Sequence, residues 1–114
     1  MSKRLYAAYF TGIDGSSFGL FYIGDGVIAG VDAGGMKYDG TFQETSDGAL
    51  EGVIQFIVPA GMKLVTGLVA GGQPKTLSAP IKLRREFGDG NAVTRIDTPA
   101  GPVNARFELL REIV

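Results

Sequence analysis

Three short apolar runs separated by glycine-marked turns constrain the fold of this chain more than any other feature. The runs comprise residues 18–23, 27–32 and 37–42. Each run is rich in aromatic or β-branched side chains, which favour β-strands. The turns between them, at residues 24–26 and 33–35, contain glycine and aspartate, which tolerate the backbone angles of tight hairpins. The stretch therefore predicts a meander of three antiparallel strands.

The rest of the chain repeats this style. Further strands are expected at residues 4–11, 49–58, 62–70, 76–87, 92–98 and 103–110. Residues 62–70 could also form one helical turn, but their β-branched side chains favour a strand. Pro80 predicts that its strand lies at a sheet edge or carries a bulge, because proline cannot donate to a central ladder. Residues 111–114 are expected to form a short tail.

These strands indicate an all-β protein with a single domain, residues 1–114, folded as a small antiparallel up-and-down β-barrel of about eight strands. A chain of 114 residues suits one core. The 18 glycines fall mostly between apolar runs, where they mark turns. No helical pattern of about 10–15 residues intervenes, which argues against parallel βαβ units. A barrel is favoured over a sandwich because closure removes exposed sheet edges.

Composition argues against several classes of function. A net charge of −1 and a pI of about 5.3 offer no bulk electrostatic reason to bind nucleic acid. Because the chain contains no cysteine and no histidine, it lacks the means for disulfides, the usual zinc sites and Ser-His nucleophiles. No apolar run is long enough for a membrane span or a secretory leader. We expect a cytoplasmic protein that is not an enzyme and uses no metal or cofactor.

Two patterns resemble functional motifs but have simpler expected roles. The segment from Gly24 to Ala29 fits a relaxed dinucleotide fingerprint, yet that motif must open a helix, and a strand is expected here instead. A hairpin turn is its expected role. Acidic residues at turns and strand ends are expected to cap backbone amides: Asp25, Asp32, Asp39, Glu44 and Asp47. For Asp32 we also expect a cross-strand ion pair with Lys37.

The densest basic run contains Lys82, Arg84 and Arg85. A solvated strand face is its expected role, since exposed charge is common on sheet surfaces. Contact with an anionic ligand or an acidic partner is the alternative.

Several early strands are apolar on both faces, as in residues 18–23, where Phe18, Leu20 and Tyr22 lie on one face and Phe21 and Ile23 on the other. Val53 and Ile57 add apolar residues to one face of the strand 49–58. A barrel wall in water should instead place polar residues outward. A second protein surface is the simplest cover for the outer face. We therefore expect a homodimer.

Strand alternation predicts which residues line the barrel interior. If Tyr38, Gly40 and Phe42 point inward, their inward neighbours would be Val27, Ala29, Val31, Leu50, Gly52, Ile54 and Phe56. This set mixes large and small residues and contains no charge, so it predicts an apolar pocket for an acyl or ring-shaped ligand. The residues expected to line that pocket are Phe42, Gly52, Ile54, Phe56 and Phe107. The alternative is a core packed tightly with the same side chains.

The segment VIAGVDAGGMKYDGTF, residues 27–42, resembles the corresponding segment of GrlR-like proteins, a family named for a negative regulator of type III secretion genes. The residues that match the family occur in the order Tyr9-Phe10, Phe18-Gly19-Leu20, Gly30-Val31-Asp32 and Tyr38-Asp39-Gly40. Residues 64–67 and 98–104 are similar to relatives of unknown function. The similarity spans most of the chain, and its glycine, aspartate and tyrosine residues are the specific part.

The resemblance implies a lipocalin-like β-barrel that dimerises, encloses an apolar cavity and binds a transcriptional activator. In that family the activator contacts an acidic cluster just after the strand that corresponds to residues 37–42. This chain keeps only Glu44 and Asp47 of such a cluster. The resemblance is therefore a better guide to the fold and the dimer of this chain than to its binding partner. The leading hypothesis is a non-enzymatic binding module that acts through protein–protein contacts. The alternative is a carrier or sensor of a small apolar ligand held in the barrel.

Overall fold

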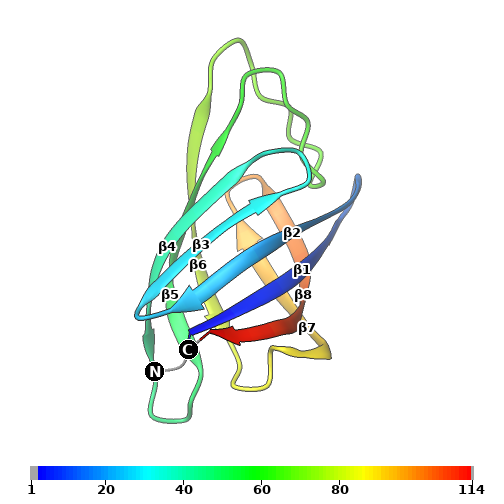
Figure 1. Ribbon diagram of the computed structural model, residues 1–114. Coiled ribbons are helices and arrows are strands. Elements are labelled where there is room, and N and C mark those ends of the chain that lie inside the picture. The colour runs from blue at the N-terminus through cyan, green and yellow to red at the C-terminus, as the bar shows by residue number, and fades with distance from the viewer. Residues whose placement is uncertain (1–2, 114) are drawn as a thin grey trace.

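Eight antiparallel strands follow one another along the chain and curl into a barrel (Figure 1). The structure is a computed structural model that describes residues 3–113, and that part contains no helix. The strands are β1 (Lys3–Gly12), β2 (Gly15–Gly24), β3 (Val27–Asp32), β4 (Lys37–Glu44), β5 (Leu50–Val58), β6 (Lys75–Leu83), β7 (Asp89–Thr98) and β8 (Gly101–Ile113). The predicted all-β, up-and-down barrel is therefore confirmed.

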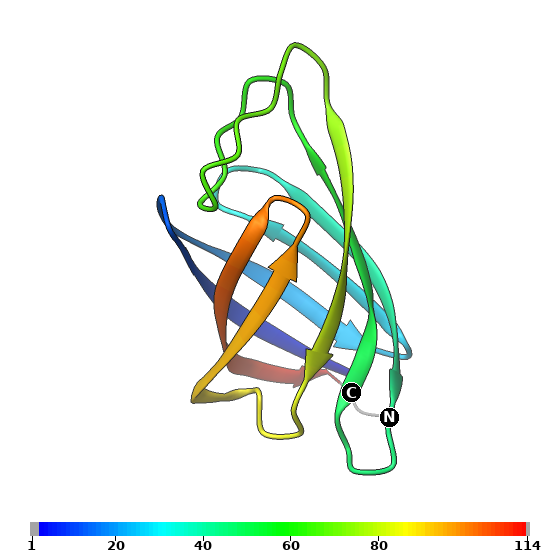
Figure 2. The same cartoon turned by 180° about the vertical axis from the view of Figure 1, so that it is seen from behind.

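The hydrogen-bonded order of the sheet is β6-β5-β4-β3-β2-β1-β8-β7. The long C-terminal strand brings the two ends of the chain together, because Arg4 pairs with Glu112 and Leu5 with Arg111. The expectation that residues 111–114 form a tail is wrong for residues 111–113, which belong to β8, and Val114 lies outside the described residues. The edge strands β6 and β7 lie in contact but form no ladder, which leaves a seam in the wall (Figure 2). Pro80 lies on β6, the edge position that its missing N–H predicts.

The segment that fits a dinucleotide fingerprint forms the hairpin between β2 and β3. Gly24 pairs with Val27, so the loop has two residues, Asp25 and Gly26. Their φ angles are 51° and 76°, as a type I′ turn requires. The expected hairpin role is confirmed.

The register between β3 and β4 differs from the prediction. Asp32 and Met36 share a backbone hydrogen bond of 3.1 Å across the loop 33–35, and Ile28 pairs with Gly40. Residues of the same parity therefore face the same side in both strands. Ile28 points inward and is 2% exposed, whereas Val31 points outward and is 42% exposed.

The expectation that Val27, Ala29 and Val31 face the interior is therefore wrong. The loop of three residues sets the register here, and a shift of one residue moves every side chain to the opposite face. On the other side of β4 the prediction is confirmed. Tyr38 pairs with Phe56 and Gly40 with Ile54.

Two of the predicted strands differ in the structure, and both differences occur at the ends of the barrel. Residues 62–70 form no strand, and only an isolated bridge joins Lys63 to Val69. They belong to the long connection 59–74, which folds over one end of the barrel and is called the lid here (Figure 1). At the other end, β6 stops at Leu83 rather than continuing to residue 87.

The early end of β6 lets Phe87 turn inward and close the barrel end opposite the lid. Its ring centroid lies 5.1 Å from that of Tyr6 and 5.5 Å from that of Phe107. These rings belong to one buried cluster, and a second cluster lies under the lid around Phe56, Val58 and Leu77. Aromatic pairs at such distances add to the free energy gained from apolar burial.

The register of β3 predicts opposite results for two neighbouring truncations. Ile28→Ala should lower the free energy of unfolding by about 2–4 kcal/mol, because it leaves a cavity in the core. Val31→Ala removes apolar atoms from the outer face and should cost less than about 1 kcal/mol. Urea unfolding followed by far-UV circular dichroism measures both values. Equal losses, or a larger loss for Val31→Ala, would contradict this register.

Candidate functional site: a covered apolar cavity

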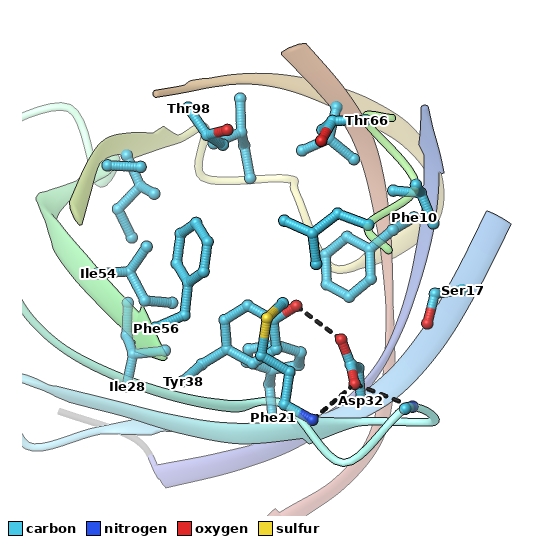
Figure 3. A pocket seen from close by; sticks show the side chains of 18 of the residues that line it. Phe10, Ser17, Phe21, Ile28, Asp32, Tyr38, Ile54, Phe56, Thr66 and Thr98 are labelled. Carbon is cyan, nitrogen blue, oxygen red and sulfur yellow. Dashed lines mark hydrogen bonds between the residues drawn. The ribbon is translucent and has the colours of Figure 1, made fainter. Parts of the chain in front are cut away.

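A cavity of about 250 Å³ occupies the barrel beneath the lid. Its walls are mostly apolar side chains from the strands, and Met62, Leu64 and Thr66 of the lid form its roof. Figure 3 shows Ile28, Ile54 and Phe56 on one side of the space and Phe10, Ser17 and Asp32 on the other. The cavity is therefore largely apolar but carries polar groups on one flank.

Three of the five residues expected to line a ligand pocket do so: Ile54, Phe56 and Phe107. Phe42 is buried in the core outside the cavity. Gly52 also lies outside, and a β-carbon there would overlap the Thr41 carbonyl of the neighbouring strand. Its lack of a side chain lets β4 and β5 pair closely and creates no ligand space. Ligand binding at any of these residues stays a prediction.

The lid is held by the turns that surround it. The backbone N–H of Asp14, in the turn between β1 and β2, donates to the carbonyl of Val65 at 2.8 Å. Asp14 also pairs with Lys63, with 2.6 Å between Oδ2 and Nζ. Inside the lid, the N–H of Leu64 donates to the carbonyl of Leu68 at 2.8 Å. The apolar residues of the lid therefore cover the cavity. Their sequence pattern had predicted a strand instead.

Asp32 is the most highly connected polar side chain at the cavity. Its Oδ1 accepts hydrogen bonds from the N–H groups of Gly34 and Met36, both at 3.0 Å. Its Oδ2 accepts one from the hydroxyl of Tyr38 at 2.9 Å (Figure 3). The expected capping of backbone amides by Asp32 is confirmed.

The expected ion pair between Asp32 and Lys37 is wrong. No salt bridge joins these residues in the part of the chain that is described. Lys37 pairs with Val31 on the outer face of the barrel, whereas Asp32 lines the cavity. Asp32 thus adds a carboxylate to the interior, which the predicted inward set did not include.

Tyr38 contacts both Asp32 and the aromatic side chains that line the cavity. Its ring centroid lies 5.0 Å from that of Phe21, 5.7 Å from that of Phe56 and 6.2 Å from that of Phe10. Burial raises the pKa of Tyr38 far above its ordinary value, and the charge and hydrogen bond of Asp32 raise it further. The phenol therefore remains a hydrogen-bond donor and holds the carboxylate in one orientation.

The two residues expected to form a partner surface lie away from the cavity, and both are exposed. Glu44 ends β4, and Asp47 lies in the following turn. Asp47 accepts hydrogen bonds from the Thr45 hydroxyl and, at 3.3 Å, from the N–H of Ala49. These bonds lower its pKa, with the Thr45 bond as the main cause. Asp47 thus caps its own turn, as expected, whereas binding of a partner stays a prediction.

The basic run is solvent-exposed, as expected. Lys82 pairs with Glu51 on the neighbouring strand, with 3.3 Å between Nζ and Oε1. Arg84 and Arg85 follow the end of β6 and are also exposed. Among residues 3–113 no group of three potential metal ligands lies together, and no helix has the length and hydrophobicity to cross a membrane.

The raised pKa of Tyr38 predicts a change in stability at high pH. Above about pH 10, the unfolded chain loses the Tyr38 proton that the folded protein retains, so the free energy of unfolding falls. Tyr38→Phe removes this contribution. Its free energy of unfolding should therefore fall less steeply than that of the wild type between about pH 9 and 11.

Urea unfolding at a series of pH values measures this slope. Tyr9→Phe is the control, because Tyr9 lies on the outer surface. An equal slope for Tyr38→Phe and the wild type would contradict a buried phenol beside a carboxylate.

No protein-family model, curated protein or solved structure matches this chain. The similarity to GrlR-like proteins therefore rests on the residues quoted above and enters below as a proposal.

Proposed function

We propose that this protein is a non-enzymatic binding module that holds a small apolar ligand inside its barrel. The observation that supports this most is the covered cavity of about 250 Å³. By the volume that liquid water occupies, it has room for about eight waters, or for a ligand on the order of ten non-hydrogen atoms. Covered apolar pockets with a few polar groups are typical of small-molecule sites.

Small residues keep this space open. Ala79 lies on the inner face of β6 and is fully buried, and it lines the cavity together with Gly34. Larger side chains at such positions would fill the interior, as they do around Phe87 at the other end. A ligand of suitable size would replace the missing contacts and gain the free energy of apolar burial.

A second candidate function, binding to another protein, is favoured by the outer face of β1–β3. Phe18 and Leu20 are 60% and 49% exposed there. Phe18 pairs with Tyr9 of β1, and Leu20 pairs with both Ala7 of β1 and Val31 of β3. The exposed apolar side chains therefore form one continuous patch rather than isolated residues, as expected of an interaction site.

We assign this patch to a second copy of the same chain. The side chains of Phe18, Leu20 and Val31 are uncharged, and Arg106 brings a charge to the edge of the patch, 4.4 Å from the ring centroid of Tyr9. A two-fold contact also uses one surface twice and needs no second complementary partner. This homodimer agrees with what the resemblance to GrlR-like proteins implies.

A regulatory role through a transcriptional activator is the most specific form of the protein-binding proposal. It rests on the resemblance and would use Glu44 and Asp47. Because Asp47 is engaged in its own turn, Glu44 would supply most of the available charge. Ligand occupancy of the barrel and protein binding at its surface are compatible, since cavity and turn are separate.

Filling the cavity should abolish ligand binding. Naphthalene, which has ten non-hydrogen atoms, serves as the apolar probe. It should bind the wild type and raise its melting temperature in a concentration-dependent way. Ala79→Leu should weaken binding at least about tenfold, because the new side chain occupies the same space. Saturation-transfer NMR and thermal unfolding measure the two effects.

The matched control is Ala29→Leu, which adds the same atoms on the outer face of β3. It should leave naphthalene binding unchanged. If the wild type fails to bind, or if Ala79→Leu binds equally well, the interior is a packed core and the proposal fails.

Breaking the outer patch should separate the dimer. Light scattering at micromolar concentration should give about twice the 12.0 kDa of one chain for the wild type. Leu20→Glu should give a monomer, because it would bury an unpaired charge in the contact. Ile13→Glu is the control, since Ile13 is an exposed apolar residue in the turn between β1 and β2. A wild type that remains a monomer would contradict the dimer.

A further inference from the structure

Most polar groups of the cavity lie on one flank; Thr98 lies toward the side of Ile54 (Figure 3), and its hydroxyl donates to the Gly101 carbonyl at 2.7 Å. Figure 3 shows Asp32, Ser17 and Thr66 around one side and Ile28, Ile54 and Phe56 around the other. A ligand with one polar end and one apolar end would match this division. The chemistry of the polar end follows from the hydrogen bonds and charges of the flank.

Asp32 has an unused acceptor position. A carboxylate offers about four acceptor sites. Its Oδ1 already accepts from the N–H groups of Gly34 and Met36, and its Oδ2 accepts from the hydroxyl of Tyr38. The remaining site is on Oδ2, and Asp32 lines the cavity. The three existing bonds hold the carboxylate in place, so a ligand donor would meet an acceptor that is already oriented.

The charge of Asp32 is not balanced by a protein cation. None of the salt bridges among residues 3–113 involves it. Lys63 also lines the cavity, but its ammonium pairs at 2.6 Å with Asp14 on the exposed side of the lid. The free charge at the polar flank is therefore negative, which favours a cationic ligand group and opposes an anionic one.

Thr66 supplies a second partner in the roof. Its Oγ1 is buried and makes no hydrogen bond. A buried hydroxyl without a partner is costly, and a ligand donor would satisfy it. An ammonium group has three N–H donors, so it can fill the free acceptor position of Asp32.

We propose that the ligand is a lipophilic primary amine whose ammonium group binds Asp32 and whose apolar part lies against Ile54 and Phe56. This inference rests on the proposed ligand-binding function of the cavity and narrows its ligand class. Fatty acids are disfavoured, because their carboxylate would be placed beside that of Asp32. Neutral alcohols can donate one hydrogen bond but bring no charge.

Three ligands of eight carbon atoms each test the assignment at neutral pH. They are n-octylamine, 1-octanol and octanoate, with cationic, neutral and anionic ends. Isothermal titration calorimetry gives the dissociation constants. Octylamine should bind at least about tenfold more tightly than octanol, as expected for a charge-assisted hydrogen bond, and octanoate should bind most weakly.

Asp32→Asn keeps the shape of the side chain and removes its charge, so it should abolish the preference for octylamine over octanol. Asp39→Asn is the matched control, because Asp39 lies on the outer face of β4, next to Tyr38. It should retain the preference. Circular dichroism verifies that each variant is folded.

Tyr38→Phe keeps the carboxylate and frees the position on Oδ2 that the phenol occupies. The preference for octylamine should persist or increase, and its loss would contradict the assignment even if Asp32→Asn fails to fold. Equal binding of all three ligands to the wild type would overturn the amine assignment and leave the apolar cavity standing. If none of the three binds, the proposed ligand-binding function fails as well.

Discussion

The hydrogen bonds of Asp32 are the interaction on which the interior of this barrel depends. Its carboxylate holds the N–H groups of Gly34 and Met36, which shapes the turn between β3 and β4. That turn sets the register that sends Ile28 inward and Val31 outward. Tyr38 completes the arrangement by donating to the same carboxylate from within the cavity. One side chain thus links the register of the wall to the chemistry of the space it encloses.

The two ends of the barrel are closed differently, so one half of the interior is filled and the other contains the cavity. At one end Phe87 turns in against Tyr6 and Phe107 and fills the interior. At the other end the chain uses the lid, which spans the opening and leaves space below it. The lid is held mainly by the turn between β1 and β2, through Asp14. Such peripheral contacts can open at lower cost than the hydrogen-bonded strands.

Apolar and charged residues are distributed unequally over the outer surface. The face of β1–β3 is apolar and continuous, whereas the charged residues of β5 and β6, such as Glu51 and Lys82, pair with each other in solvent. The seam between β6 and β7 lies on that charged side, and Pro80 withholds a donor from it. The edge of β6 therefore lacks one backbone donor and is flanked by charge, both of which disfavour pairing with another strand. The dimer that we propose would therefore use the apolar face.

The sequence by itself determined the strand content, most hairpins and the interior face of β4 and β5, because glycine-marked turns and alternation of side chains are local signals. It identified Ile54, Phe56 and Phe107 as residues of the interior. Only the tertiary structure decided the register of β3, since alternation places a turn at residues 33–35 but does not show that Asp32 bonds to Met36 across it. It also decided that residues 62–70 form a cover and that Phe87 leaves its strand, because an apolar segment follows the surface available for burial rather than its own propensity.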